Sequence, residues 1–180
     1  HDPYAAKEFT LRDALSHRSG LGRRGDALWY GTDYTREEII RRVRYLVPNN
    51  SFRSAYGYQN IMFLTAGEAL GAAAGTSWDA LVHRRIFAPL GMRRSNTSVK
   101  PLARVPNVAQ PHASTSDGPA PIPWRDLDNI APAGSINSSA AEMASWIRFL
   151  LAGGEHEVAR LLERATLREV MSPHTIIPAP

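Results

Sequence analysis

Tyr58 and Asn60 are the residues of this sequence whose types and spacing most directly suggest chemistry. They flank a single residue just before an apolar helical segment, so in an extended turn their side chains would project to the same side. A phenol and a carboxamide at a helix N-terminus could do acid–base work and hold a substrate. The residues alone leave a structural alternative open, in which the Tyr58 hydroxyl is hydrogen-bonded and Asn60 caps the helix.

Two common arrangements of a nucleophilic serine are absent from the 180 residues. No serine has the flanking glycines of a G-x-S-x-G turn. An S-x-x-K motif is also absent, because Lys7 and Lys100 are the only lysines and the residues three positions before them are Tyr4 and Thr97. The sequence therefore offers a candidate proton acceptor without a matching nucleophile.

The histidines show no metal-binding spacing, and the chain has no cysteine to support them. We therefore expect no metal site and no other cofactor. His17, which begins the stretch His17-Arg18-Ser19-Gly20, could hydrogen-bond within a turn or take part in chemistry, and its position alone does not decide between the two.

Capping signals divide the chain into helices. The predicted helices cover about residues 10–17, 35–47, 60–74, 76–87 and 139–152, with two shorter ones from about Glu157 and Thr166. Residues 93–133 hold more than half of the thirteen prolines and are predicted to form a long excursion with at most a short strand. The expected fold is mostly α. Its predicted core residues are Ile61, Leu64, Leu70, Leu81, Ile86, Leu90, Trp146 and Leu150.

The composition argues against some classes of binding partner. The net charge is +4, but the arginines are interspersed with acidic residues and do not form one basic face with aromatics, so nucleic-acid binding is not expected. No apolar run approaches the roughly 18–20 residues that a membrane span needs. A small-molecule substrate is the remaining expectation for a ligand.

Five blocks of the sequence, taken in order, resemble the serine β-lactamase-like hydrolases, which include class C β-lactamases, D-Ala-D-Ala peptidases and related esterases. The blocks are Leu15–Leu21 (L-x-H-x-S-G-L), Tyr58–Asn60 (Y-x-N), Gly75–Trp78, Ile86–Met92 (I-F-x-P-L-G-M) and Pro132–Ser139, which resembles the family's glycine-rich strand. The resemblance implies that residues 1–180 form a single partial domain, the helical half of the β-lactamase/penicillin-binding-protein-like α+β fold, with little strand.

The resemblance also implies roles for single residues. Tyr58 would accept the proton of the nucleophilic serine, and Asn60 would hydrogen-bond the substrate. His17 and Ser19 match a block that shapes the pocket wall, and Gly134 falls near a pocket-lining position. The substrate would be a β-lactam, a D-Ala peptide or a small ester, hydrolysed through an acyl-enzyme.

The departures from the family pattern are the missing S-x-x-K and the missing K-T-G or H-x-G strand. They predict an internal piece of a longer hydrolase, inactive by itself, with an exposed apolar patch beside Tyr58 and along residues 60–74 that favours self-association. The alternative is a non-catalytic helical binding module on the same scaffold. The resemblance implies a periplasmic or secreted location for the parent protein.

Overall fold

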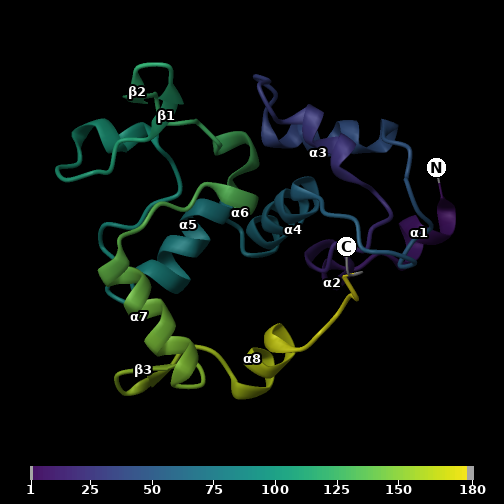
Figure 1. Cartoon of the computed structure of the whole chain (residues 1–180). Helices are drawn as coiled ribbons and strands as arrows, with labels where there is room; N and C mark the ends of the chain where they lie inside the picture. The colour runs from purple at the N-terminus through teal and green to yellow at the C-terminus, as the bar shows by residue number, and fades with distance from the viewer. Residues whose placement is uncertain (1, 178–180) are drawn as a thin grey trace.

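The computed structural model describes residues 2–177 and is mostly helical, as expected (Figure 1). The first half of the chain contains α1 (Pro3–Glu8), α2 (Leu11–Leu15), η1 (Arg23–Leu28), α3 (Arg36–Arg42), η2 (Val43–Tyr45) and α4 (Asn60–Ala73). After α4 follow α5 (Trp78–Val82), the π-helical turn η3 (His83–Phe87), η4 (Lys100–Arg104), η5 (Asp128–Ile130), α6 (Ala131–Gly134), α7 (Ala140–Leu151) and α8 (Arg164–Met171).

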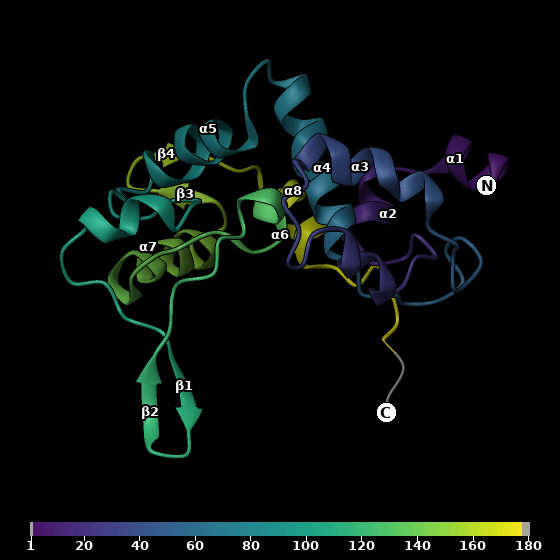
Figure 2. The same ribbon diagram turned by 90° about the horizontal axis from the view of Figure 1, so that it is seen from above.

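The strands form two separate antiparallel hairpins. In the first, β1 (His112–Thr115) pairs with β2 (Gly118–Pro121) in the register His112 to Pro121 and Thr115 to Gly118. This hairpin lies in the proline-rich excursion and protrudes from the helices (Figure 2). In the second, β3 (Glu155–His156) pairs with β4 (Ala159–Arg160).

Side-chain caps explain where the main helices begin. Thr10 and Asp13 form a reciprocal capping box at α2, which satisfies backbone groups that a short helix would leave unpaired. The hydroxyl groups of Thr35, Ser77 and Ser139 cap α3, α5 and α7 in the same position relative to each helix. The starts predicted at residues 10, 35 and 139 are therefore confirmed, and the start predicted at residue 76 falls one residue later, at Ser77.

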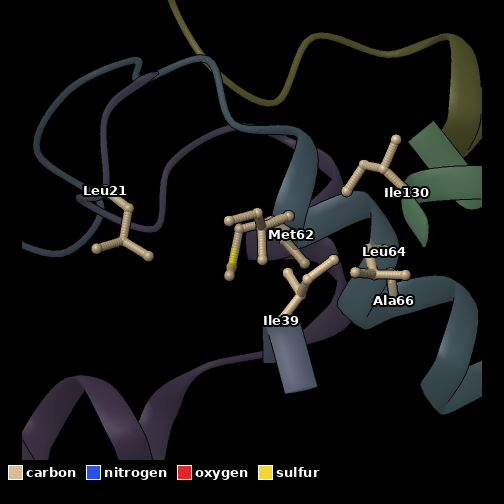
Figure 3. Packing of buried hydrophobic residues seen from close by; sticks show 8 residues of the cluster. Leu21, Ile39, Met62, Leu64, Ala66 and Ile130 are labelled. Atoms are coloured by element: carbon tan, nitrogen blue, oxygen red, sulfur yellow. The ribbon is translucent and has the colours of Figure 1, made fainter. Parts of the chain in front are cut away.

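α4 lies in the middle of the molecule and contacts α2, α3, α5 and α6. Its apolar side chains form a core cluster with residues from α2, the turn after α2, α3 and η5 (Figure 3). The cluster consists of Ala14, Leu21, Ile39, Ile61, Met62, Leu64, Ala66 and Ile130. A second cluster joins α5, η3 and α7 and consists of Trp78, Val82, Phe87, Leu90, Met92, Ala131 and Phe149.

The predicted core is confirmed at Ile61, Leu64 and Leu90, which are buried. Leu81, Ile86, Trp146 and Leu150 are half-buried. The prediction is wrong for Leu70, which is 43% exposed. Leu70 lies in the last turn of α4, where Ala69, Ala72 and Ala73 are exposed as well, so the cover over the helix ends before this residue. One turn earlier the packing is close, because a Cβ on Gly67 would lie 2.5 Å from Pro132.

Two predicted elements have a different structure. The helix expected from Glu157 is instead the turn of the β3–β4 hairpin, where Glu157 adopts a left-handed backbone with φ of 53°. The strand expected at 132–139 begins as α6, because Pro132 suits the first turn of a helix. Beyond α6, Asn137 pairs with Asn96 through two backbone hydrogen bonds of 2.9 and 3.1 Å.

The apolar surface is also placed differently from the prediction. Most of α4 is covered, and the exposed apolar stripe lies on α7, where Met143, Ile147 and Leu151 follow one another at intervals of four residues. Among the described residues no helix is both long and apolar enough to cross a membrane.

Candidate active site

The segment before Tyr58 runs beside the turn that contains His17. The Gly57 N–H donates to the His17 carbonyl oxygen at 2.8 Å, and the Arg53 N–H donates to the Arg18 carbonyl oxygen at 3.0 Å. A Cβ on Gly57 would lie 2.5 Å from the Leu21 carbonyl oxygen, so this close approach requires glycine. Backbone contacts therefore fix the path of the chain into Tyr58.

A buried carboxylate also holds the His17 turn and the segment before Tyr58 together. Asp13 is fully buried in α2 and accepts hydrogen bonds from Arg18 Nε at 2.6 Å and from Arg53 Nε and Nη2, both at 2.8 Å. The hydrogen bond from Arg53 is the main cause that holds the pKa of Asp13 well below its ordinary value, with Thr10 and Arg18 adding to it against the effect of burial. Asp13 thus ties α2 to both segments that lead to the candidate site.

Gln59 is the N-cap of α4, and Asn60 is the first residue of the helix. Gln59 is fully buried; its side-chain oxygen accepts from the Ile61 N–H, and its Nε2 donates to the Gly22 carbonyl oxygen at 2.7 Å. The capping role that the structural alternative gave to Asn60 is therefore wrong. The Asn60 side chain is left available for another function.

Tyr58 is partly exposed at the start of α4, with 37% of its surface accessible. Its ring lies 4.8 Å from the His17 ring, and the Arg23 guanidinium lies 5.1 Å from the Tyr58 ring centroid. Within residues 2–177 its hydroxyl makes no hydrogen bond, so the hydroxyl-bonded alternative is also not what the structure shows. The Tyr58 ring thus contacts His17 and Arg23, whereas its hydroxyl has no hydrogen-bond partner among the described residues.

Asn60 is half-buried, and its Nδ2 donates to Asp26 Oδ1 at 3.4 Å. Asp26 belongs to η1, the same element that supplies Arg23 over Tyr58. η1 therefore lies beside both candidate residues and connects them.

His17 has a structural place next to Tyr58. Its Nδ1 accepts a hydrogen bond from the Gln59 N–H at 3.1 Å, which requires that this nitrogen carry no proton. Its ring also lies 5.0 Å from the ring of Phe63. Burial lowers the pKa of His17 from its ordinary value, which favours the neutral ring that the hydrogen bond needs.

Ser19 and Gly134 lie apart from Tyr58 in their contacts. The Ser19 hydroxyl accepts from the Leu21 N–H at 3.2 Å, and Ser19 lines a cavity of about 360 Å³ together with Phe9 and Met62. Gly134 is exposed at the end of α6. The structure connects His17, Tyr58 and Asn60 through direct contacts and shared neighbours, and it does not show Ser19 or Gly134 among them.

A larger cavity of about 760 Å³ lies between the segment 29–36 and the segment 125–129. Its lining combines aromatic side chains with charged groups of both signs: Trp29, Tyr30, Tyr34, Arg36, Lys100, Arg125, Asp126 and Asp128. Trp29 links this cavity to the candidate site, because its Nε1 donates to Asp26 Oδ1 at 2.8 Å.

Three residues of this site were not found by sequence reasoning: Arg23, Asp26 and Gln59. Gln59 carried one signal, its place inside Tyr-x-Asn, but nothing showed that it would be buried. Arg23 and Asp26 are more than thirty residues away from the motif in sequence and reach it through the fold. Among the described residues, no cluster of histidine and acidic side chains has the arrangement of a metal site.

Solved structures share this fold. A D-amino acid amidase from Ochrobactrum anthropi SV3 superimposes with a TM-score of 0.73 at 23% identity, over 93% of this chain and 49% of the amidase. An octameric penicillin-binding protein homologue from Pyrococcus abyssi gives a TM-score of 0.73 at 20% identity, over 91% of this chain and 38% of that chain.

Curated proteins are also similar to this chain in sequence. Unguisins hydrolase ungD of Aspergillus violaceofuscus is 29% identical over 158 residues, which cover 83% of this chain and 28% of the relative. Beta-lactamase-like protein 2 of Dictyostelium discoideum is 29% identical over 95% of this chain and 31% of the relative. The chain thus spans about a third of the length of these relatives. Residues 1–177 match the family described as Beta-lactamase, and this chain belongs to that family of serine β-lactamase-like hydrolases.

Proposed function

We propose that this chain carries the Tyr-x-Asn part of a serine acyl hydrolase that cleaves small amide or ester substrates through an acyl-enzyme. The observation that carries the proposal is Tyr58, which is 37% exposed, whose hydroxyl makes no hydrogen bond within residues 2–177, and whose ring lies against His17 and Arg23. An open hydroxyl on a fixed ring suits a group that must accept a proton from a nucleophile.

The proposed mechanism divides the work between two residues. The Tyr58 oxygen, in its deprotonated form, accepts the proton of a serine hydroxyl as that oxygen attacks the substrate carbonyl carbon. The proton then passes to the nitrogen or oxygen of the leaving group as its bond to the carbonyl carbon breaks, which leaves an ester on serine. Asn60 holds the substrate in place through its carboxamide. Water then hydrolyses the ester, and the serine recovers its proton.

The nucleophile is proposed to come from another part of the same protein, because these 180 residues contain no S-x-x-K serine. The accessible surface supports the view that further polypeptide packs here. It amounts to 11990 Å², whereas a compact monomer of 19.8 kDa exposes about 8,600 Å². The apolar stripe on α7 is part of this surface, and contact with the rest of the protein or with a second copy would cover it.

The names of the relatives suggest the bond to test first. One solved relative is a D-amino acid amidase, and two curated relatives are hydrolases of unguisins. The cavity at Trp29 combines aromatic walls with charged groups, which suits a substrate with an apolar side chain and polar ends. We therefore place amides, including amides of D-amino acids, ahead of β-lactams and esters.

The test compares the 180-residue chain with a longer version of the protein that includes an S-x-x-K segment. Substrates are a D-phenylalanine amide, a p-nitrophenyl ester and a chromogenic cephalosporin. We expect no turnover by the short chain, turnover by the long version, and a loss of roughly 10²–10⁴-fold in the long version with Tyr58→Phe.

Tyr45→Phe is the matched control, because Tyr45 is 73% exposed on η2 and should leave turnover unchanged. Enzyme-like turnover by the short chain would show that a different nucleophile is at work. If the long version binds these compounds but Tyr58→Phe does not change its turnover of them, a binding module becomes the better explanation.

A further inference from the structure

The β1–β2 hairpin protrudes from the helical part of the molecule (Figure 2). Its antiparallel register pairs His112 with Pro121 and Thr115 with Gly118. Each strand of such a pair turns the backbone N–H and C=O groups of alternate residues toward its partner, and those of the residues in between point outward. The outer edges of β1 and β2 therefore present different residues to another molecule.

The outer edge of β2 lacks backbone donors. The Ile122 N–H donates to the Pro111 carbonyl oxygen at 2.8 Å, which fixes the even-numbered residues of β2 as those that face β1. The residues that face outward are Pro119, Pro121 and, just after the strand, Pro123. Because proline has no backbone N–H, a further strand cannot form a regular ladder on this edge.

The outer edge of β1 retains its donors and acceptors. The same register directs Ala113 and Thr115 toward β2 and the backbone groups of His112 and Ser114 outward. His112 and Ser114 are exposed, and their backbone groups have no hydrogen-bond partner within residues 2–177. β1 contains neither proline nor a lysine, arginine or acidic residue, which are the usual means of blocking a free edge. The hairpin thus blocks one edge and leaves the other able to pair.

We propose that the β1 edge binds a second copy of this chain, with β1 against β1 in antiparallel register about a two-fold axis at Ala113. In that register His112 of each copy lies opposite Ser114 of the other. Both are outward-facing residues, so each of these two pairs exchanges two backbone hydrogen bonds. The product is a four-stranded sheet in the order β2–β1–β1–β2. This inference goes beyond the proposed function and does not depend on it.

The prolines favour a second copy as the occupant. Within this hairpin the β1 edge is the one that can pair, and a second copy offers the same edge with donors and acceptors at matching intervals. The resulting sheet ends on both sides in the proline edge of β2, so association closes at two copies and does not continue into a fibre. Antiparallel pairing also places the two helical bodies at opposite ends of the sheet.

The first measurement is sedimentation equilibrium of the 180-residue chain at concentrations up to about 1 mM, because a short edge forms a small and weak interface. We expect a reversible equilibrium between monomer and dimer. Ser114→Pro removes one outward N–H from each copy and should weaken association about 10-fold or more. Ser114 faces away from β2, so the hairpin itself should persist. Ser114→Ala is the matched control, which keeps the N–H and should leave association unchanged.

The second measurement is amide hydrogen exchange, followed by NMR of the ¹⁵N-labelled chain at low and high concentration. Ala113 and Thr115 should be protected at both concentrations, because they face β2. His112 and Ser114 should exchange rapidly in the monomer and slow down as the dimer forms. If their exchange does not change with concentration while Ala113 and Thr115 stay protected, the proposal is overturned.

Other occupants give different results. Ile147→Ser alters the exposed apolar stripe on α7 and should leave the dimer intact. If Ile147→Ser abolishes association and Ser114→Pro does not, the copies meet through α7 and the proposal fails. It also fails if the chain is monomeric at every concentration. In a longer version of the protein, protected His112 and Ser114 amides in a monomer would show that other polypeptide covers the β1 edge, which would equally overturn the proposal.

Discussion

Replacing Asp13 by Asn should destabilise the chain strongly although the volume of the side chain is retained. Asp13 has no solvent-accessible surface and accepts hydrogen bonds from Thr10, Arg18 and Arg53. Asparagine presents an NH₂ group where one carboxylate oxygen stood, so some of these donors lose their acceptor. It also removes the negative charge that lies between two guanidinium groups.

The size of the effect follows from the burial of the pair. Removing one partner of a buried ion pair costs about 3–5 kcal/mol. Arg18 and Arg53 are partly exposed and can regain water, which places the expected loss near the lower end, about 3 kcal/mol. For a domain of this size each kcal/mol shifts Tm by about 2–4 °C, so the expected fall is about 6–12 °C.

The assay is thermal unfolding followed by circular dichroism at pH 7, with Asp117→Asn as the control. Asp117 lies exposed in the turn between β1 and β2, and its replacement should leave Tm unchanged. A fall of less than about 2 °C for Asp13→Asn would refute the reasoning, because it would correspond to less than one kcal/mol.

The same variant gives a pH dependence with a defined sign. The pKa of Asp13 is lowered in the folded state, so the unfolded chain binds more protons as the pH falls below the ordinary carboxyl value of 3.8. The stabilisation by Asp13 is complete above that value and is lost progressively below it. The difference in stability between the parent chain and Asp13→Asn should therefore shrink between about pH 4 and pH 2.

Two further predictions concern the segment that leads into Tyr58. Because burial lowers the pKa of His17 below 6.5, the stability of the chain should be constant above that pH and fall as the pH drops below it. Measurements of Tm at pH 7.5 and pH 5.5 test this. The fall in Tm should be smaller in His17→Asn, which lacks the titrating ring and in which asparagine tolerates the backbone φ of 54°. Gly57→Ala should cost about 1–3 kcal/mol in chemical unfolding, because its Cβ would lie 2.5 Å from a backbone oxygen. Gly134→Ala, with its nearest neighbour at 3.9 Å, is the control, and equal stability of the two variants would contradict the packing argument.

Local features were determined by the sequence alone. Helix starts depend on one hydroxyl and the three residues after it, so the predicted starts at residues 10, 35 and 139 coincide with the N-caps of α2, α3 and α7. The start predicted at residue 76 is one residue early, because Ser77 is the N-cap of α5. The family could also be recognised, because its motifs are short contiguous blocks. The Y-x-N block is likewise visible as a short contiguous motif, whereas the roles of Tyr58 and Asn60 are a proposal.

The partners of those residues were decided by tertiary structure. Gln59 could be identified as the buried cap only once Gly22 and Gly25 were seen to pack against it, and Asp26 reaches Asn60 from 34 positions earlier in the chain. Periodicity likewise placed Leu70 in the core, but the neighbouring elements do not cover the last turn of α4, and Leu70 is exposed there. A side chain's neighbours across the fold are set by how closely backbones approach, and neither composition nor spacing within one segment contains that information.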